Sequence, residues 1–228
     1  MGRTSATPHK PGPGVGALPA TPPGDTGRQR AATSGTDGQR ERILEAARDL
    51  FARQGYALTT IQQIADAVGA TKPFVYYYFR DKRDIFERLS WPAAVECFTS
   101  MDFPPDDTRA AHVKVAEGLQ RLVRATLAHY PHAFFPYREP QVYRPEYIAA
   151  QKRLARHFYQ RFCALLEEGR RDGHFDFGET RLTAQAACSL PGFLYTWYRP
   201  DGRLPPDELA TELTRLAWRV LGLRPTAA

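Results

Sequence analysis

The side chains best suited to a specific chemistry lie between Lys72 and Lys82, where the sequence reads KPFVYYYFRDK. Lysine ammonium groups and tyrosine hydroxyls donate to phosphate oxygens, and aromatic rings contact the methyl group of thymine. On a helical wheel of about 100° per residue, Tyr77 lies roughly opposite Val75, so some rings must face outward when Val75 faces a core. This pattern indicates a helix that enters the major groove of DNA. The alternative is that the tyrosines are half-buried packing with solvated hydroxyls.

The preceding residues predict the other half of a helix-turn-helix. Thr59 or Thr60 is available as an N-cap, and apolar residues then follow the period of one buried helical stripe: Ile61, Ile64, Ala65 and Val68. Gly69 ends this helix because it accepts the positive φ of a sharp turn, and Pro73 falls in the first turn of the next helix, where proline is tolerated.

The flanking segments complete a small helical core. Upstream, a helix of roughly four turns closes at Gly55 and carries a stripe made of Ile43, Leu44, Ala46, Ala47, Leu50 and Phe51. Downstream, Asp81 is a predicted N-cap for a helix whose apolar stripe is Ile85, Phe86 and Leu89. Three helices therefore make one core, and a fourth leaves it.

Two stretches of this region, LFARQGY and TTIQQIADAVGATKPFVYYYFRDKRDIF, resemble the tetracycline-repressor-like (TetR/AcrR) transcription regulators over about residues 39–89. The resemblance implies DNA contacts from two helices of the motif and from the residue that follows them. By position these are Thr60, Gln62, Lys72, Pro73, Phe74, Tyr76, Tyr77, Tyr78 and Lys82.

Composition excludes several classes of protein. The chain has 228 residues, of which 43% are hydrophobic, enough to bury a full core in one or two domains. We find neither an apolar run long enough to span a bilayer nor a secretory signal. Cys97, Cys163 and Cys188 lack metal-ligand spacing, which favours reduced core thiols in a cytoplasmic protein. The net charge of +6 is spread along the chain, so it does not by itself indicate DNA binding.

The predicted fold is all-α, with three parts. Residues 1–36 are rich in Pro, Gly, Thr and Ala and are expected to be a disordered extension. Residues 37–90 form the three-helix DNA-binding domain, and residues 91–228 form a helical bundle for ligand binding and dimerisation. Its expected helices are 91–99, 108–130, 145–171, 180–198 and 206–221, each bounded by Pro, Gly or Asp.

The last two expected helices each carry an apolar stripe. One is Leu182, Ala186, Leu190, Phe193, Leu194 and Trp197, and the other is Leu209, Leu213, Leu216, Ala217, Val220 and Leu221. Two such helices can pair with their copies in a four-helix dimer interface, or both stripes can face the chain's own core. The resemblance favours a homodimer that binds two half-sites. Pro191 and Gly192 are expected to kink the first of these helices.

A ligand pocket is predicted from aromatic and cationic side chains of the bundle. The segment 130–147 holds four prolines and six aromatic residues and cannot be one regular helix. The expected lining residues are Phe134, Tyr137, Arg138, Tyr143, Arg144, His157, Phe158, Phe162 and Trp197. The alternative is aromatic packing beneath a loop, with solvated arginines. The ending TWYRPDGRLPPDELATEL is similar to that of family members that respond to acyl-coenzyme A thioesters, whose phosphates arginines would suit.

No enzyme pattern is found. His129 and His132 are separated by Pro131, and no acidic or thiol ligand completes a metal set at matching spacing. No nucleophile elbow or phosphate-binding glycine loop occurs, and no cofactor is expected.

The sequence therefore predicts a homodimeric, ligand-responsive regulator, most simply a repressor. A small molecule would move the helix that starts at Asp81 and weaken binding to a palindromic operator. Two alternatives stay open: a DNA-binding regulator without an effector, and a helical module that binds protein or small molecules and has a degenerate DNA-reading end.

Overall fold

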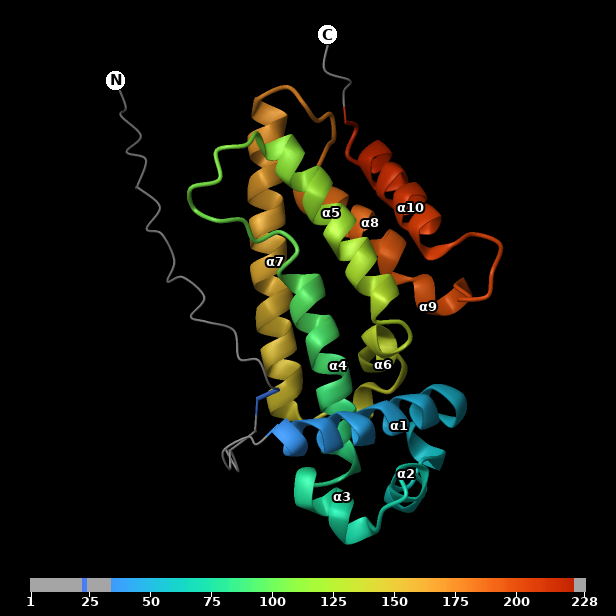
Figure 1. Cartoon of the computed structure of the whole chain (residues 1–228). Coiled ribbons are helices and arrows are strands. Elements are labelled where there is room, and N and C mark those ends of the chain that lie inside the picture. The colour runs from blue at the N-terminus through green and yellow to red at the C-terminus, as the bar shows by residue number, and fades with distance from the viewer. Residues whose placement is uncertain (1–21, 24–33, 224–228) are drawn as a thin grey trace.

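The computed structural model describes residues 22–23 and 34–223, and in this part of the chain all regular structure is helical (Figure 1). The helices are α1 (Ser34–Leu58), α2 (Ile61–Ala67), α3 (Lys72–Tyr78), α4 (Lys82–Phe98), α5 (Ala111–Ala128), α6 (Phe135–Arg138), α7 (Pro145–Arg171), α8 (Thr180–Gly192), α9 (Leu194–Trp197) and α10 (Pro206–Val220), with 3-10 turns at His132–Phe134 and Pro140–Val142. The predicted disorder of residues 1–36 lies almost wholly outside the described residues, and α1 begins inside that range, at Ser34.

The first three helices form the small core that the sequence predicts. α1 lies across the lower end of the molecule with α2 and α3 beneath it, and α4 rises from them into the bundle (Figure 1). Ile43, Ile64, Val75 and Ile85, one from each helix, are completely buried in the same cluster. Gly55 has φ 76° and breaks the helical conformation of α1, as expected for the residue that closes the first helix.

The fourth helix differs from its prediction. A separate helix starting at residue 91 is wrong, because α4 runs without interruption from Lys82 to Phe98 with Pro92 inside it. Pro92 is exposed, whereas Trp91, Ala93 and Ala94 around it are buried, so packing on the inner face holds the helix through the proline. The predicted domain boundary after residue 90 therefore falls within one continuous helix.

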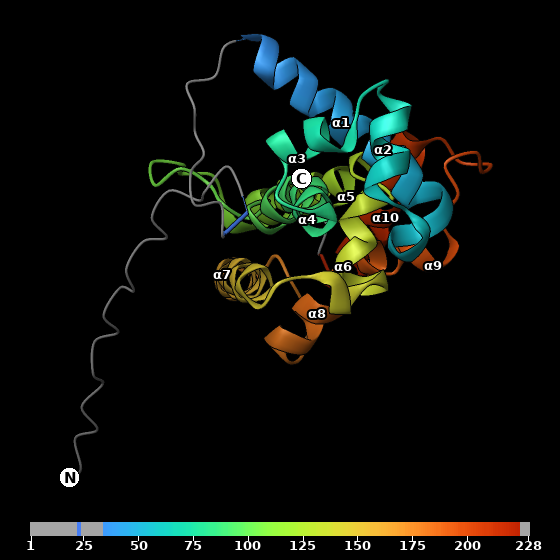
Figure 2. The ribbon, with the colours of Figure 1, turned by 90° about the horizontal axis from the view of Figure 1, so that it is seen from below.

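The remaining helices make the bundle. α7 runs its full length with the predicted bounds, and Figure 2, seen from the lower end, shows α4 and α7 nearly end-on beside each other. The predicted helix 180–198 is two helices, since Phe193 has φ −99° and ψ 7° directly after Pro191 and Gly192. No helix in the described part of the chain is long and apolar enough to cross a membrane.

Candidate DNA-binding surface and internal cavity

The turn between α2 and α3 is built from the residues that the sequence singles out. Thr60 caps α2: its hydroxyl accepts from the Gln63 amide at 3.2 Å, while the Gln63 side chain accepts from the Thr60 amide at 2.9 Å. Gly69 has φ 67° and permits the reversal, and Pro73 lies in the first turn of α3. These local interactions fix the angle at which α3 projects from the core.

α3 presents its aromatic residues on two faces. Val75 and Phe79 are buried, whereas Tyr76 is 50% exposed and Tyr77 60% exposed. Phe74 and Tyr78 are half-buried, with ring centroids 5.2 Å apart, and Tyr77 packs edge-on against Tyr78 at 5.0 Å. The outward direction predicted for Tyr77 is confirmed, and the inner rings support it from below.

The other predicted contacts of this surface are also mostly exposed. Lys72 and Pro73 lie open at the start of α3, and Thr60 and Gln62 lie open at the start of α2. The Gln62 amide donates to Asp66 Oδ1 at 2.6 Å, which orients its side chain along α2. DNA contact by these residues stays a prediction.

Lys82 has a different environment. Its Nζ donates to the carbonyl oxygens of Tyr56 at 2.7 Å and Thr59 at 2.6 Å and lies 4.1 Å from the centre of the Tyr56 ring. Burial lowers the pKa of the ammonium group. The side chain therefore ties the start of α4 to the end of α1, and a phosphate contact would use its third proton.

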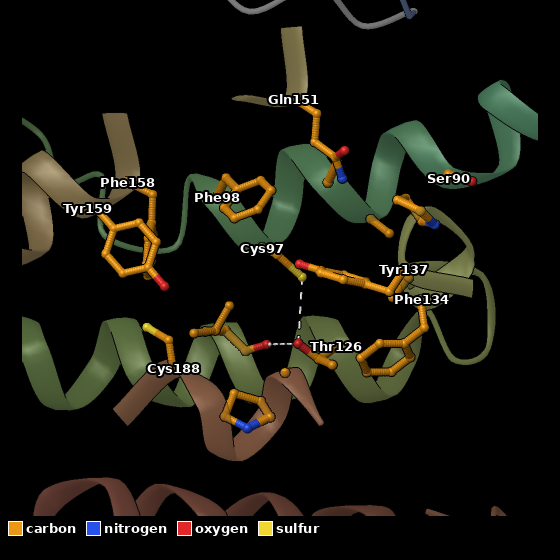
Figure 3. A pocket seen from close by; sticks show the side chains of 17 residues that line it. Ser90, Cys97, Phe98, Thr126, Phe134, Tyr137, Gln151, Phe158, Tyr159 and Cys188 are labelled. Atoms are coloured by element: carbon orange, nitrogen blue, oxygen red, sulfur yellow. Dashed lines mark hydrogen bonds between the residues drawn. The ribbon is translucent and has the colours of Figure 1, made fainter. Parts of the chain in front are cut away.

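An internal cavity of about 100 Å³ lies in the bundle, bounded by α4, α5, α7 and α8 and by the residues around α6 (Figure 3). Its lining is Ser90, Ala93, Ala94, Cys97, Phe98, Leu122, Thr126, Ala133, Phe134, Pro136, Tyr137, Gln151, Phe158, Tyr159, Cys188, Pro191 and Gly192. A second hollow of about 190 Å³ shares four of these residues and adds Lys152 and Ala155, so it forms the mouth. Of the described residues, none that lines the inner cavity carries a charged side chain.

Three of the nine predicted pocket residues line this cavity: Phe134, Tyr137 and Phe158. Tyr137 is 57% exposed, yet its hydroxyl points inward beside Cys97 (Figure 3), and burial raises its pKa. The ring therefore lies across the mouth with its polar end inside.

The predicted aromatic lining is wrong for three other residues. Tyr143 lies behind the wall, where its hydroxyl meets Ser90 Oγ at 2.6 Å. Phe162 is fully buried in the core of the bundle, and Trp197 is 54% exposed on α9, beyond the break at Phe193. Their positions follow from where the helices end, which aromatic content alone does not indicate.

The three predicted cationic residues do not line the cavity either, and carboxylates elsewhere hold two of them, His157 and Arg144. His157 bonds to Asp102 at 2.8 Å, and Arg138 is exposed on α6. Arg144 donates to both carboxylate oxygens of Asp81, at 2.9 and 2.7 Å, and to Glu87. Its backbone amide donates to Glu87 Oε1 at 2.7 Å, so one residue at the start of α7 fastens two carboxylates of α4.

The two thiols that line the cavity are unreactive at neutral pH. Burial raises the pKa of Cys97 to about 11 and that of Cys188 to about 12, so both stay protonated at neutral pH. Both are free and pack against the core of the bundle, as expected for core thiols, and both also line the cavity. Ala93 and Ala94, small residues of α4 that line the cavity, were not predicted, although they follow helical spacing together with Ser90 and Cys97.

The two predicted stripes near the C-terminus divide between the core and the surface. Leu209, Leu213, Ala217 and Leu221 of the second stripe are buried in the chain's own core. Exposed apolar side chains remain on α8 to α10: Leu182 (69% exposed), Phe193 (56%), Trp197 (54%), Leu216 (40%) and Val220 (39%).

Comparison with known proteins agrees with this architecture. A family model described as bacterial regulatory proteins, tetR family, matches residues 43–89, and one described as tetracyclin repressor-like, C-terminal domain, matches residues 102–221. The transcriptional repressor KstR2 of Rhodococcus jostii (strain RHA1) is 27% identical over 194 residues, which are 79% of this chain and 89% of the relative.

Solved structures show the same fold. The TetR family regulator PfmR of Thermus thermophilus superposes with a TM-score of 0.69 at 24% identity, covering 81% of this chain and 100% of that one. AibR, solved in complex with isovaleryl coenzyme A and operator DNA, gives a TM-score of 0.63 at 18% identity, covering 82% and 100%. The two family models together span both the helix-turn-helix and the bundle. The chain therefore belongs to the TetR/AcrR family of transcriptional regulators.

Proposed function

We propose that this chain is a homodimeric repressor that holds a palindromic operator through two copies of α3 and leaves it when a small acyl-coenzyme A thioester fills the cavity. The observation that carries this proposal is the position of α4. This helix contributes Ile85 and Phe86 to the core against which α3 packs. One to three turns later it contributes Ser90 and Cys97 to the cavity wall. A ligand that moves α4 therefore changes the direction of α3.

The volume and lining of the cavity favour a short acyl group as the buried part of the ligand. An apolar cavity of about 150 Å³ accommodates benzene, and the volumes here are about 100 Å³ inside and about 190 Å³ at the mouth. This space suits an acyl group of about four to eight carbons. The uncharged lining favours a neutral group, and Tyr159 and Gln151 offer hydrogen bonds to a thioester carbonyl. The similar fold of AibR, which binds isovaleryl coenzyme A, supports the same class.

The exposed apolar side chains of α8 to α10 support a dimer. α8 and α10 pack against each other, so these side chains belong to neighbouring helices that can pair with their copies in a four-helix bundle. Apolar surface of this kind marks an interaction site more often than a solvated face. We propose residues 37–90 as the DNA-binding part and residues 91–228 as the effector-binding and dimerising part.

The test of the effector is a mobility-shift assay with DNA from the gene's own neighbourhood, with and without butyryl-, isovaleryl-, hexanoyl- and palmitoyl-coenzyme A. We expect a sequence-specific complex that one of the first three thioesters releases. A specific complex that no thioester changes would leave a DNA-binding regulator and overturn the effector. Absence of any specific complex would favour the helical module with a degenerate DNA-reading end.

The test of the dimer compares two matched substitutions by analytical ultracentrifugation. Val220→Glu places a charge among the exposed residues of α10, whereas Val113→Glu places one on α5 at a valine that is equally exposed, 39% in both cases. We expect the first to dissociate the dimer and the second to leave it intact. Equal behaviour of the two variants would place the interface elsewhere.

A further inference from the structure

We propose that Lys152 and Arg156 on α7 form a site for the phosphates of the effector's head group, at the mouth of the cavity. This inference rests on the proposed acyl-coenzyme A effector and deepens it, because it assigns the charged half of the ligand to named residues of α7. Lys152 lines the mouth together with Tyr137 and Gln151.

The two cations lie along one edge of α7. Residues four apart on a helix differ by about 40° and by about 6 Å along the axis, so Arg156 lies one turn beyond Lys152 on the same side. Ala155 lines the mouth from the same turn, and Tyr159, one turn further on, lines the inner cavity. The rim of the cavity and the cationic edge therefore run side by side along α7.

These cations are available to a ligand. Lys152, Arg153 and Arg156 are all exposed. In the part of the chain that the structure describes, other residues form the ion pairs, including Arg144 with Asp81 and Glu87 and Arg170 with Glu167, and no acidic side chain is bound to Lys152 or Arg156. Unpaired cations beside an opening attract a polyanion and hold it by charge-assisted hydrogen bonds.

The charge distribution separates the two ends of a ligand. The described residues of the inner cavity include no charged side chain, so burying a phosphate there would cost several kcal/mol without compensation. At the mouth, Lys152 is solvated and offers a positive charge at no such cost. Both regions are matched by a ligand whose apolar tail lies inside the cavity and whose organic phosphate or diphosphate lies outside, at the mouth. The ordinary alternative for exposed cations on a helix is a solvated face that binds no ligand.

The test measures binding of two matched ligands by isothermal titration calorimetry to the full-length protein: isovaleryl-coenzyme A and S-isovaleryl pantetheine, which has the same tail and no phosphate. We expect the wild type to bind the coenzyme A thioester about ten-fold more tightly, the sum of two exposed charge contacts. In Lys152→Ala/Arg156→Ala this advantage falls to about two-fold or less, while binding of the pantetheine thioester is unchanged. Raising the salt concentration weakens the advantage of the wild type and has little effect on the variant.

Arg161→Ala is the control. Arg161 is also exposed on α7 but lies about 180° around the helix from Lys152, so its removal changes net charge without changing the rim. We expect it to retain the ten-fold difference. Both variants are checked for the wild-type thermal midpoint, and both are expected to bind operator DNA as tightly as the wild type.

Three outcomes overturn the proposal in distinguishable ways. If both ligands bind the wild type equally, or if the double variant keeps the ten-fold difference, the head-group site is wrong and the effector class stands. If the wild type binds neither ligand and no thioester of the panel releases DNA, the effector class is wrong as well. If the double variant loses operator affinity without any ligand, these cations contact DNA and the head-group assignment fails.

Discussion

Removing the Arg144 side chain should destabilise the junction between the DNA-reading helices and the bundle by about 3 kcal/mol. Arg144 contacts two carboxylates whose environments differ: the Glu87 side chain is 3% exposed, whereas that of Asp81 is 48% exposed. Breaking a buried pair from one side costs about 3–5 kcal/mol because a charge stays buried without a partner. An exposed pair is worth at most about 1 kcal/mol. The contact with Glu87 therefore accounts for most of the expected loss of stability.

The backbone amide of residue 144 places the expected loss at the lower end of the range of about 3–5 kcal/mol. In Arg144→Ala the amide of residue 144 still donates to Glu87 Oε1, so one hydrogen bond to the carboxylate survives. The assay is urea unfolding followed by tryptophan fluorescence, to which Trp91, buried in α4 one turn from Glu87, contributes. With a slope of about 3 kcal/mol per molar urea, the midpoint should fall by roughly 1 M without a change of slope.

The control is Glu87→Gln/Arg144→Met, which removes both charges and keeps the shapes. It should recover most of the lost stability, because no charge is left buried alone. A loss below about 1 kcal/mol in Arg144→Ala would refute the argument that Glu87 is an uncompensated buried charge. So would a double variant that is as unstable as the single one.

Three further predictions concern the operator, the protonation of the core and the size of the effector. Tyr77→Ala should weaken operator binding at least about ten-fold in a mobility-shift assay while leaving the thermal midpoint unchanged, since this ring is largely exposed, and Tyr77→Phe should separate the ring from the hydroxyl. Burial, and then the nearby His129 and Arg48, lower the pKa of His132 to about 4. The unfolded chain binds this proton near pH 6.5, so between pH 6.5 and pH 4 the unfolded state holds more protons than the folded state. The free energy of unfolding should therefore fall by about 3 kcal/mol as pH drops from 6.5 to 4. Urea titrations of His132→Gln should show a smaller loss over the same window, and an unchanged pH dependence would contradict the assignment. Tyr137→Ala opens the mouth of the cavity, so an acyl chain longer by two methylenes should gain about ten-fold in affinity relative to the wild type, measured by calorimetry; an unchanged preference would mean that another residue limits the chain.

Much of the DNA-reading end could be predicted because its geometry depends on neighbours in sequence. The Thr60 cap involves Gln63, three residues away, the turn depends on the positive φ of Gly69, and α4 begins where Asp81 accepts from the amide of Asp84 at 2.7 Å. Each of these interactions is complete within one helical turn. Helical period then places Val75 inside and Tyr77 outside.

The cavity could not be predicted in the same way, because its members come from distant segments. Arg144 and His157 were expected to face a ligand, but their partners lie 57 and 55 residues away, at Glu87 and Asp102. A sequence shows that a cation is present but does not show which carboxylate pairs with it in the folded chain. The wall of α4 is made of small side chains such as Ala93 and Ala94, and small side chains on a helix are equally compatible with a packed core.

A chain of contacts joins that wall to the junction of the two parts. Ser90 lines the cavity and donates its only proton to the Phe86 carbonyl at 2.9 Å, so in their 2.6 Å contact the Tyr143 hydroxyl must be the donor. Burial raises the pKa of Tyr143, which keeps that proton in place. Tyr143 directly precedes Arg144, the residue that fastens Asp81 and Glu87 of α4. A ligand that displaces Ser90 from the cavity wall would thus disturb the residue next to this ion pair, which gives the proposed movement of α4 a contiguous physical route from effector to α3.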